Sequence, residues 1–333
     1  MHNLVIATMN SNEIDLNEWV VHHILLGVDH VYIYDDHSDP PISGIVSELP
    51  EEFKSKITIY RLDSHYEINK GTYTSEDTDK LLYFDQTIYD KHKRNKQRYL
   101  MNFFLKNHKH ISKYCFFCDV DEYIYLKEDE SIHEYLNKMS EYDIIYIPWI
   151  YYGTSFYVDK PKGLLLDNFR CHHGRYDCGK SIVKMANVSE IHCIHTIADG
   201  YKKYSYDRNS PLYSHPIHIN HYITKAYKSV LRKKKEHGLG QTNDFHRSIQ
   251  SILYFGIGGG LSEIKNEYIM EKYVSKINRV LNYELNDRPM HFNYSGKARI
   301  CVDNKPINEI QPQDLALIEY ILDCKNVEYK DFS

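Results

Sequence analysis

Hydrophobic and polar positions follow two different periods along the first part of the chain. Three short apolar runs are typical of strands buried on both faces: residues 3–9, 30–36 and 57–63. Between the first two, apolar residues recur at helical spacing over residues 16–24, with Asp15 as a candidate cap and Gly27 as a candidate end. This succession predicts a mostly parallel α/β sheet with helices on its faces.

The pattern continues to the end of the chain. Residues 64–80 are polar and predict a loop, and a helix is predicted over residues 86–108. The segment "CFFCDVDEYIYL" at Cys115–Leu126 begins with an apolar run that predicts a further buried strand, and Asp119, Asp121 and Glu122 follow this run directly. Other strands are predicted at 143–153, 180–185 and 190–197, and other helices at 223–238, 266–281 and 313–324. Because there is no repeat or low-complexity linker, we expect one domain over residues 1–240 with a helical extension over 241–333.

Composition excludes several classes of protein. With 333 residues, 42% hydrophobic and 26% charged, the chain is typical of globular proteins. The net charge of -5 provides no general attraction to nucleic acid or to an anionic membrane. The seven cysteines have no regular spacing, which favours a reducing compartment. The chain lacks a signal-peptide pattern and any apolar run near the roughly 20 residues of a membrane span, so we expect a soluble cytoplasmic protein.

Polar side chains follow three of the predicted strands. The set comprises Thr8, Asn12 and Glu13 after the first strand, Asp35 and Asp36 at the end of the second, and Asp119, Asp121 and Glu122 after the fourth. The carboxyl ends of parallel strands meet at one edge of a sheet, which is where ligands bind in such folds. We therefore expect these side chains to converge on a single site.

The pair Asp119 and Asp121 is the strongest candidate for metal binding. On an extended backbone, residues two apart point the same way. Two carboxylates on one side suit Mg²⁺ or Mn²⁺, which also accept oxygens of substrate phosphates. Such a metal would bridge a nucleotide diphosphate and offset charge on a departing phosphate. The alternative is a strand end that simply lies in solvent.

Three other candidates each have a structural alternative. Asp35 or Asp36 would contact the ribose or base of a nucleotide, whereas "DDHSDPP" is also rich in residues that form turns. His221 is a candidate metal ligand or a packed core histidine. Lys180 is a candidate for contact with a phosphate or the acceptor, or faces solvent as most lysines do.

An ordered set of sequence blocks resembles one known group of enzymes. The blocks are "SNEIDLNEWVVHHILLGVDHVYIYDDHSDPP", "QRYLMNFFLKNHKHISKYCFFCDVDEYIYL", "IPWIYYGTSF", "GKSIVK" and "INHYITKAYKSVLRKKKEHG". In this order they resemble GT-A glycosyltransferases of the family 2-like and family 92 group over about Val5–Gly238. The order is more specific than any single block. Thr154 and Ala226 stand where the pattern has serine, in blocks on the acceptor side.

The resemblance implies a metal-dependent glycosyltransferase with a GT-A-like fold. Such an enzyme moves a sugar from a nucleotide-sugar donor to a hydroxyl of a glycan or other acceptor. Family 92 members are inverting and often galactosyltransferases, so the implied donor is a UDP-sugar, with UDP-galactose as the candidate. The implied donor contacts are Thr8, Glu13, Asp35 or Asp36, and Lys180, and the implied ligands of Mn²⁺ or Mg²⁺ are Asp119, Asp121 and His221.

Inversion also needs a general base that takes the proton of the acceptor hydroxyl. Asp177 and Asp199 lie in the acceptor half of the sequence, but neither falls on a matched block. Two other functions stay open. A sugar-phosphate nucleotidyltransferase would carry a glycine-rich basic loop after the first strand, and "TMNSNE" is not one. A catalytically inactive nucleotide-sugar-binding protein would be expected to lose the D-x-D pair, which is intact here.

Overall fold

The structure is a computed structural model. It describes residues 1–13, 15–62, 96–127, 131–153, 159–169, 178–193, 195, 200–205, 215–223, 225–226, 229, 267–283, 301–302 and 305–306. The chain divides into two compact units. The first consists of Met1–Trp149, Tyr176–Asn220 and Arg279–Leu281, and the second of Ile150–Arg175, His221–Asn278 and Asn282–Ser333. A domain boundary at residue 240 stays a prediction.

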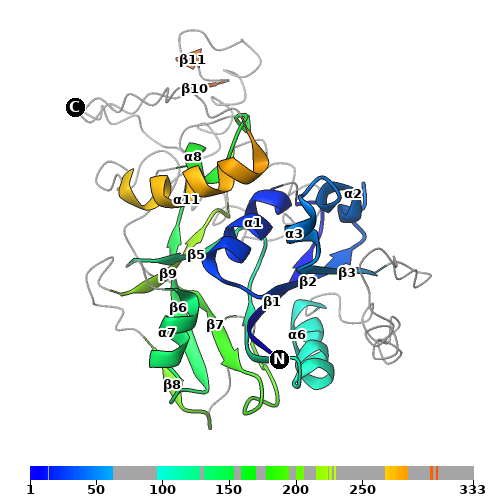
Figure 1. Cartoon of the computed structure of the whole chain (residues 1–333), viewed down its shortest axis with the longest axis vertical. Helices are drawn as coiled ribbons and strands as arrows, with labels where there is room; N and C mark the ends of the chain where they lie inside the picture. The colour runs from blue at the N-terminus through cyan, green and yellow to red at the C-terminus, as the bar shows by residue number, and fades with distance from the viewer. Residues whose placement is uncertain are drawn as a thin grey trace, which may run out of the picture. The chain divides into compact units, whose positions relative to one another are not determined.

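A single large sheet dominates the described residues (Figure 1). Its strands are β1 (His2–Asn10), β2 (His30–Asp36), β3 (Ile57–Leu62), β4 (Ser112–Phe117), β5 (Glu122–Leu126), β6 (Ile144–Tyr151), β7 (Gly179–Lys184), β8 (Lys203–Tyr204) and β9 (Ile217–His221). The strand order is β3-β2-β1-β4-β7-β6-β9-β5, and β8 pairs with β6. A separate pair consists of β10 (Cys301–Val302) and β11 (Lys305–Pro306).

Five helices belong to the first unit: α1 (Leu16–Leu26), α2 (Ile42–Val46), α3 (Glu51–Lys54), α6 (Lys96–His108) and α7 (Ile132–Lys138). The second unit contains α8 (Leu165–Asn168) and most of α11 (Glu267–Leu281). Within the described residues, no helix is both long enough and apolar enough to cross a membrane.

The half of the sheet that positions the polar strand ends is parallel. β1 pairs in parallel with β2 and with β4, and β2 pairs in parallel with β3. The strand β7 then runs antiparallel to both β4 and β6. The predicted α/β fold with a mostly parallel sheet is therefore confirmed, and the carboxyl ends of β1, β2 and β4 lie at one edge.

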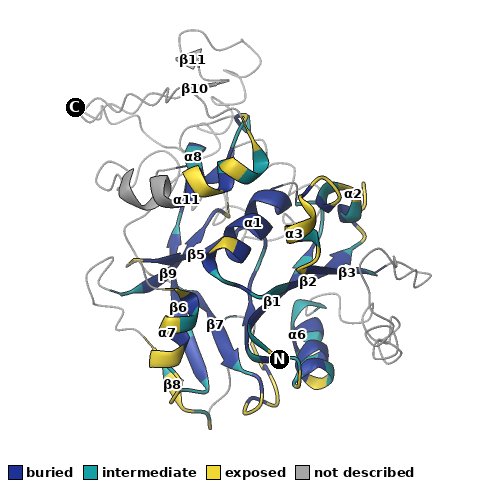
Figure 2. Ribbon diagram, viewed as in Figure 1, coloured by how far each residue is buried: buried dark blue, intermediate teal, exposed yellow. Residues whose placement is uncertain are grey.

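Helices cover both faces of this parallel half. Because strand residues alternate between faces, Val5 and Ala7 of β1 point towards α6, where they join one buried cluster with Leu100 and Phe104. In Figure 1, α6 lies on one side of β1, β2 and β3, and α1, α2 and α3 lie on the other. The sheet is accordingly buried on both faces, as Figure 2 shows.

The helix α1 is buried more completely than its sequence predicts. Every residue of α1 except Leu25 is buried, because the helix contacts α2, α3 and β5. Gly27 ends it in the left-handed region with φ of 112°, as predicted. Asp15 precedes it, but its side chain makes no capping hydrogen bond, so the expected cap is wrong.

The strand predicted before Asp119 is confirmed as β4, and a turn joins it to a second strand, β5. β4 ends at Phe117 and β5 begins at Glu122, whose backbone N–H donates to the carbonyl of Asp119 at 3.1 Å. Asp119 and Asp121 therefore lie in a turn, and the argument from an extended backbone is wrong.

The strand predicted at residues 190–197 is also wrong, since its described residues, 190–193 and 195, form no strand. Asn102 of α6 takes the place of a strand partner. Its Oδ1 accepts from the backbone N–H of Ile191 at 2.7 Å, and its Nδ2 donates to the Ile191 carbonyl at 2.8 Å. A side chain thus satisfies the backbone groups that a neighbouring strand would otherwise satisfy.

The other predicted elements have mixed outcomes. The strands at 143–153 and 180–185 are confirmed as β6 and β7, and the helix at 266–281 as α11. The described part of the helix at 86–108 is α6. The loop at 64–80, the helix at 313–324 and nearly all of the helix at 223–238 lie outside the described residues.

Two buried histidines attach α1 to β5. His22 Nε2 donates to the Ile124 carbonyl at 2.8 Å, and the Ile124 N–H donates to His23 Nε2 at 3.4 Å. The Nδ1 of His23 donates to the Trp19 carbonyl at 2.9 Å. Burial lowers the pKa of His22 to about 4, despite its hydrogen bond, and lowers the pKa of His23 well below its usual value. Both imidazoles are therefore neutral when they hold β5, the strand that follows the Asp119 turn.

This pair makes stability depend on pH. The pKa of His22 is 6.5 without its surroundings and about 4 in the folded protein, so between these values only the unfolded chain binds the proton. We expect the free energy of unfolding to fall as pH is lowered through this window, by roughly 3 kcal/mol in total from His22. Urea unfolding at about pH 7 and about pH 5 measures the slope.

The variant His22→Gln should flatten that slope. His110→Gln, at an exposed histidine, is the matched control. An equal change of slope in the two variants would contradict the assignment to burial of His22.

Candidate active site

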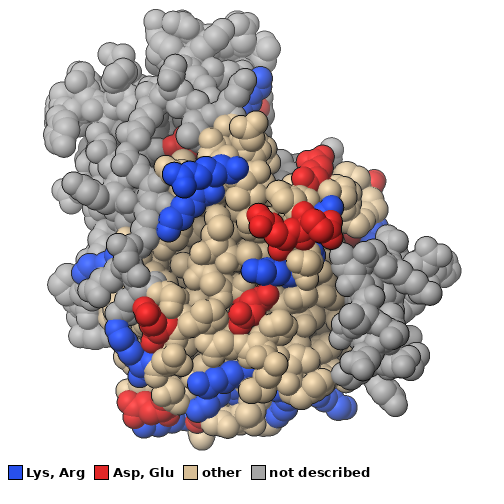
Figure 3. Space-filling model, viewed as in Figure 1, with Lys and Arg blue, Asp and Glu red and all other residues tan. Residues whose placement is uncertain are grey.

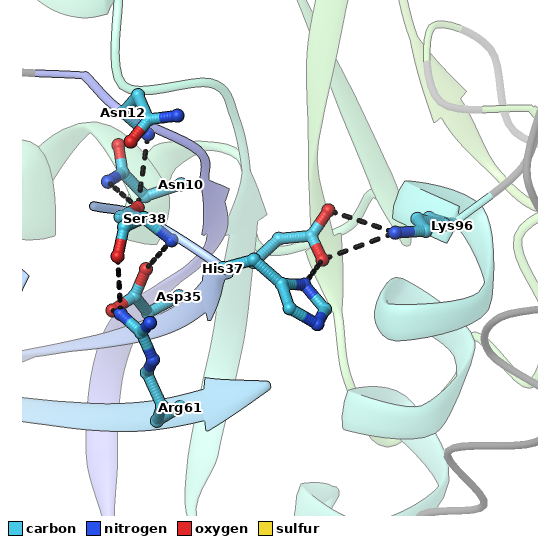
Figure 4. Close-up of polar contacts among 8 residues, drawn as sticks. Asn10, Asn12, Asp35, His37, Ser38, Arg61 and Lys96 are labelled. Carbon is cyan, nitrogen blue, oxygen red and sulfur yellow. Dashed lines mark hydrogen bonds and ion pairs between the residues drawn. The ribbon is translucent and has the colours of Figure 1, made fainter. Parts of the chain in front are cut away.

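Asp35 is fixed at the end of β2 by three donors. Its carboxylate accepts from Arg61 Nη1 at 2.8 Å and from the backbone N–H groups of Ser38 at 3.1 Å and Ile42 at 3.3 Å (Figure 4). The side chain is only 1% exposed. Arg61 lies opposite Asp35 on β3 and also donates to the Ser38 carbonyl at 2.7 Å. Asp35 therefore organises the turn after β2, as the structural alternative predicts.

The same turn is bonded to the loop that follows β1. The hydroxyl of Ser38 accepts from Asn10 Nδ2 at 3.3 Å and from the Asn12 backbone N–H at 3.0 Å. Asn12 Oδ1 in turn accepts from the Asp39 N–H at 2.8 Å. Both Asn12 and His37 have positive φ, 60° and 58°, so each loop reverses sharply. The two strand ends thus form one rigid polar edge.

Asp36 faces the other way along this edge. Lys96, the first residue of α6, lies 3.2 Å from both of its carboxylate oxygens, and His37 Nδ1 lies 2.8 Å from Oδ1 (Figure 4). The side chain of Asp36 is 12% exposed and that of His37 is 46% exposed. Asp36 and His37 are therefore accessible to a ligand where Asp35 is not. Contact of either acid with a nucleotide stays a prediction.

Asp119 is held by residues from two different elements. Gln97 of α6 donates through Nε2 to Asp119 Oδ1, and Lys180 of β7 lies with Nζ 2.9 Å from Oδ2. Lys96 and Gln97 are adjacent, so the first turn of α6 contacts Asp36 at the end of β2 and Asp119 after β4. This joint contact brings together the strand ends that the sequence predicts to converge.

Lys180 is the cation of a buried charge cluster. Its side chain has no exposed surface, so the solvent-facing alternative is wrong. Its Nζ also lies 3.8 Å from Glu122 Oε1 and 5.7 Å from the centre of the Trp149 ring. Glu122 is fully buried, and its Oε2 accepts from the Asp119 N–H at 3.0 Å.

The electrostatics of this cluster favour a charged lysine. Burial alone would lower the pKa of Lys180, but the carboxylates of Glu122 and Asp119 outweigh it and raise that pKa. Burial raises the pKa of Glu122 well above its usual value, and Lys180 partly opposes this. Sequence reasoning gave Glu122 no role of its own, although an acid beside a D-x-D pair in an apolar run was the available signal.

Thr8 and Glu13 lie on the β1 side of the edge. Thr8 is 4% exposed and lines a small cavity of about 10 Å³ together with Gln97 and Cys118. A cavity of this size holds about one water molecule. Glu13 is half-buried in the loop after β1. Their contact with a nucleotide stays a prediction.

Four candidate residues remain. Asp121 is 8% exposed in the turn after β4. His221 belongs to the second unit, where its ring lies 5.4 Å from that of Tyr151, so a metal shared with Asp121 stays a prediction. Asp177 and Asp199 lie outside the described residues. Among the described residues, no group of three or more His, Cys, Asp or Glu side chains is placed to hold a metal ion.

The distribution of surface charge does not indicate a particular class of ligand. On the face drawn in Figure 3, acidic and basic side chains both occur, and neither sign covers the described surface. This distribution agrees with the small net charge of -5. The polar edge of the sheet is therefore the candidate site.

The fold is that of an α/β protein with a mostly parallel sheet, a class in which ligands commonly bind at the carboxyl ends of the strands. The model of the family described as glycosyltransferase family 92 matches residues 6–253, which is most of the chain. The chain therefore belongs to glycosyltransferase family 92. This confirms the resemblance found in the sequence blocks.

Other comparisons add little. No curated protein matches the sequence. Among solved structures, the X-ray structure of the mannosyltransferase Ktr4p from S. cerevisiae is similar, with 16% sequence identity and a TM-score of 0.24. That match covers 46% of this chain and 41% of that one, so this chain matches less than half of the length of Ktr4p.

The Asp35–Arg61 pair generates a stability prediction. Arg61→Met would leave Asp35 charged and 1% exposed without its cation. We expect the free energy of unfolding to fall by roughly 3 kcal/mol, because an uncompensated buried charge is costly. Urea unfolding provides the measurement.

Lys54→Met is the matched control. Lys54 lies 3.0 Å from Glu51, whose side chain is 83% exposed, and exposed pairs add little stability. Equal losses in the two variants would show that the Asp35–Arg61 pair does not behave as a buried one.

Proposed function

We propose that the protein transfers a sugar from a UDP-sugar donor, with UDP-galactose as the first candidate, to a hydroxyl of a glycan or other acceptor, with inversion and in a metal-dependent manner. Membership of family 92 supports glycosyl transfer. The proposed position of the donor rests on two contacts made by adjacent residues of α6. Lys96 contacts Asp36, and Gln97 contacts Asp119. These contacts place a candidate nucleoside contact and a D-x-D acid on one edge of the sheet.

The donor set fits a hard divalent cation. Asp119 and Asp121 supply carboxylates within one turn, and Mg²⁺ and Mn²⁺ take their remaining ligands from phosphate oxygens and water. Both oxygens of Asp119 already have donors, Gln97 and Lys180, so Asp121 is the proposed direct ligand and Asp119 contributes to nucleotide or metal. When bound, the cation would offset the negative charge of the departing diphosphate.

The residues around the cation would bind and orient the donor. Asp36 and the exposed ring of His37 would contact the nucleoside, with Thr8 and Glu13 on the β1 side. The rigid bonding between the loops after β1 and β2 supports this role, because a preformed site orients its ligand at low entropic cost. The general base that would accept the proton of the acceptor hydroxyl remains a choice between Asp177 and Asp199.

The proposed metal ligand can be tested with one isosteric change. Asp121→Asn keeps the shape of the side chain and removes its charge. We expect Mn²⁺-dependent hydrolysis of the preferred donor, first identified from a panel of UDP- and GDP-sugars, to fall by about 10²–10³ in kcat, because a positioned charge at the leaving group is lost.

Asp143→Asn is the control for that change. Asp143 lies beside the amino end of β4, where its carbonyl accepts from Lys184, the residue opposite Tyr114, and so lies away from the turn at Asp119. Unchanged turnover in folded Asp121→Asn would exclude Asp121 as a ligand.

His221 provides a second test of the metal site. We expect His221→Ala to weaken Mn²⁺ and UDP binding together by about tenfold or more, because a neutral imidazole is a good ligand for Mn²⁺. His218→Ala is a matched change, since both rings are buried and the His218 ring lies 4.5 Å from that of Tyr125. Calorimetry with Mn²⁺ and UDP measures both affinities. The reverse result would assign His221 to the core.

A further inference from the structure

Lys180 combines complete burial with contacts to the proposed donor site. A fully buried ammonium is costly unless anions meet it, and here the carboxylates of Asp119 and Glu122 lie 2.9 Å and 3.8 Å away. Burial also separates Lys180 from any bound donor, because none of its side chain is exposed. Its influence on a ligand must therefore pass through a neighbouring residue.

That neighbour is Asp119, the exposed member of the cluster. The Asp119 side chain is 34% exposed, whereas Glu122 has no exposed surface. Lys180 contacts one carboxylate oxygen of Asp119 and Gln97 contacts the other, while the Asp119 N–H donates to Glu122. These contacts come from β7, α6 and β5, so they fix the orientation of the carboxylate before any ligand binds.

We propose that Lys180 is a positioning residue for the donor site, whose buried ammonium orients the Asp119 carboxylate towards the donor while Glu122 holds the ammonium in place. The inference rests on the proposed function, and it gives Lys180 an indirect role in place of direct contact with a phosphate or the acceptor. Since both Asp119 oxygens have donors within the protein, Asp119 contributes through a fixed orientation, and Asp121 stays the proposed direct ligand of the cation.

A purely structural role for Lys180 makes a different prediction. In that case the ion pair only balances charge, and any change that restores the balance should restore every property of the protein. Lys180→Met leaves Glu122 buried without its cation and is expected to lower the melting temperature strongly. The double variant Lys180→Met/Glu122→Gln removes both buried charges together, and such replacements of whole pairs are commonly tolerated.

The experiment compares the wild type, Glu122→Gln and the double variant by melting temperature, Mn²⁺ binding by electron paramagnetic resonance, and UDP binding by calorimetry with excess Mn²⁺. We expect the double variant to melt close to the wild type and to bind UDP about 10–100-fold more weakly, as for other residues that orient a ligating group. Glu122→Gln removes the anion that holds the ammonium but keeps the Lys180–Asp119 contact, so we expect it to weaken UDP binding less than the double variant does.

Gln97→Ala keeps the test decisive if the double variant fails to fold. It removes the other donor to Asp119 from a half-buried position and leaves the Lys180–Glu122 pair intact. We expect Gln97→Ala to weaken UDP binding about threefold to tenfold, as the loss of one typical hydrogen bond does. Wild-type UDP affinity in Gln97→Ala would then overturn the proposal.

The outcomes separate the inference from the proposed function. A double variant that melts and binds UDP like the wild type would show that Lys180 only balances charge, and would overturn the inference alone. A wild-type protein that binds no UDP with Mn²⁺ or Mg²⁺ would overturn the proposed donor site and the inference with it.

Discussion

Acidic side chains at the ends of buried strands must each find a cation or a set of donors inside the protein, because a carboxylate away from water is otherwise very costly. In this protein each such cation comes from a different element. Arg61 of β3 meets Asp35, Lys96 of α6 meets Asp36, and Lys180 of β7 meets Asp119. The requirement to match these charges therefore ties the strands and α6 together at the same edge that is proposed to bind the donor.

Adjacent acids acquire different roles from strand geometry. Asp35 and Asp36 are neighbours in β2, and successive side chains of a strand point to opposite faces. Asp35 turns into the protein and binds the backbone of its own turn, whereas Asp36 remains partly exposed beside Lys96 and His37. An apparently redundant pair thus supplies one acid that builds the edge and one that a ligand can reach.

The sequence predicts what depends on local pattern and misses what depends on distant partners. β1, β2 and β3 follow directly from apolar runs, and parallel pairing then brings Asp36 and Asp119 to one edge. The extended backbone expected at Asp119 and Asp121 was wrong because the Glu122 N–H donates back to the Asp119 carbonyl and closes a turn. The strand expected at 190–197 does not form in its described residues, where Asn102, 89 positions away, satisfies the backbone of Ile191. The burial of Lys180 depends on Asp119, 61 positions away, and no local pattern records it.

The late position of Lys180 has a consequence for how the chain folds. During synthesis β1 to β5 leave the ribosome before β7, so Glu122 is made well before the residue that balances its charge. In an N-terminal fragment that ends before residue 180, the Glu122 side chain would either stay in water or bind a proton. Each of these costs free energy and so opposes the packing of β5 against α1. Packing of the core around β5 and assembly of the polar edge are therefore a single cooperative event that requires β7.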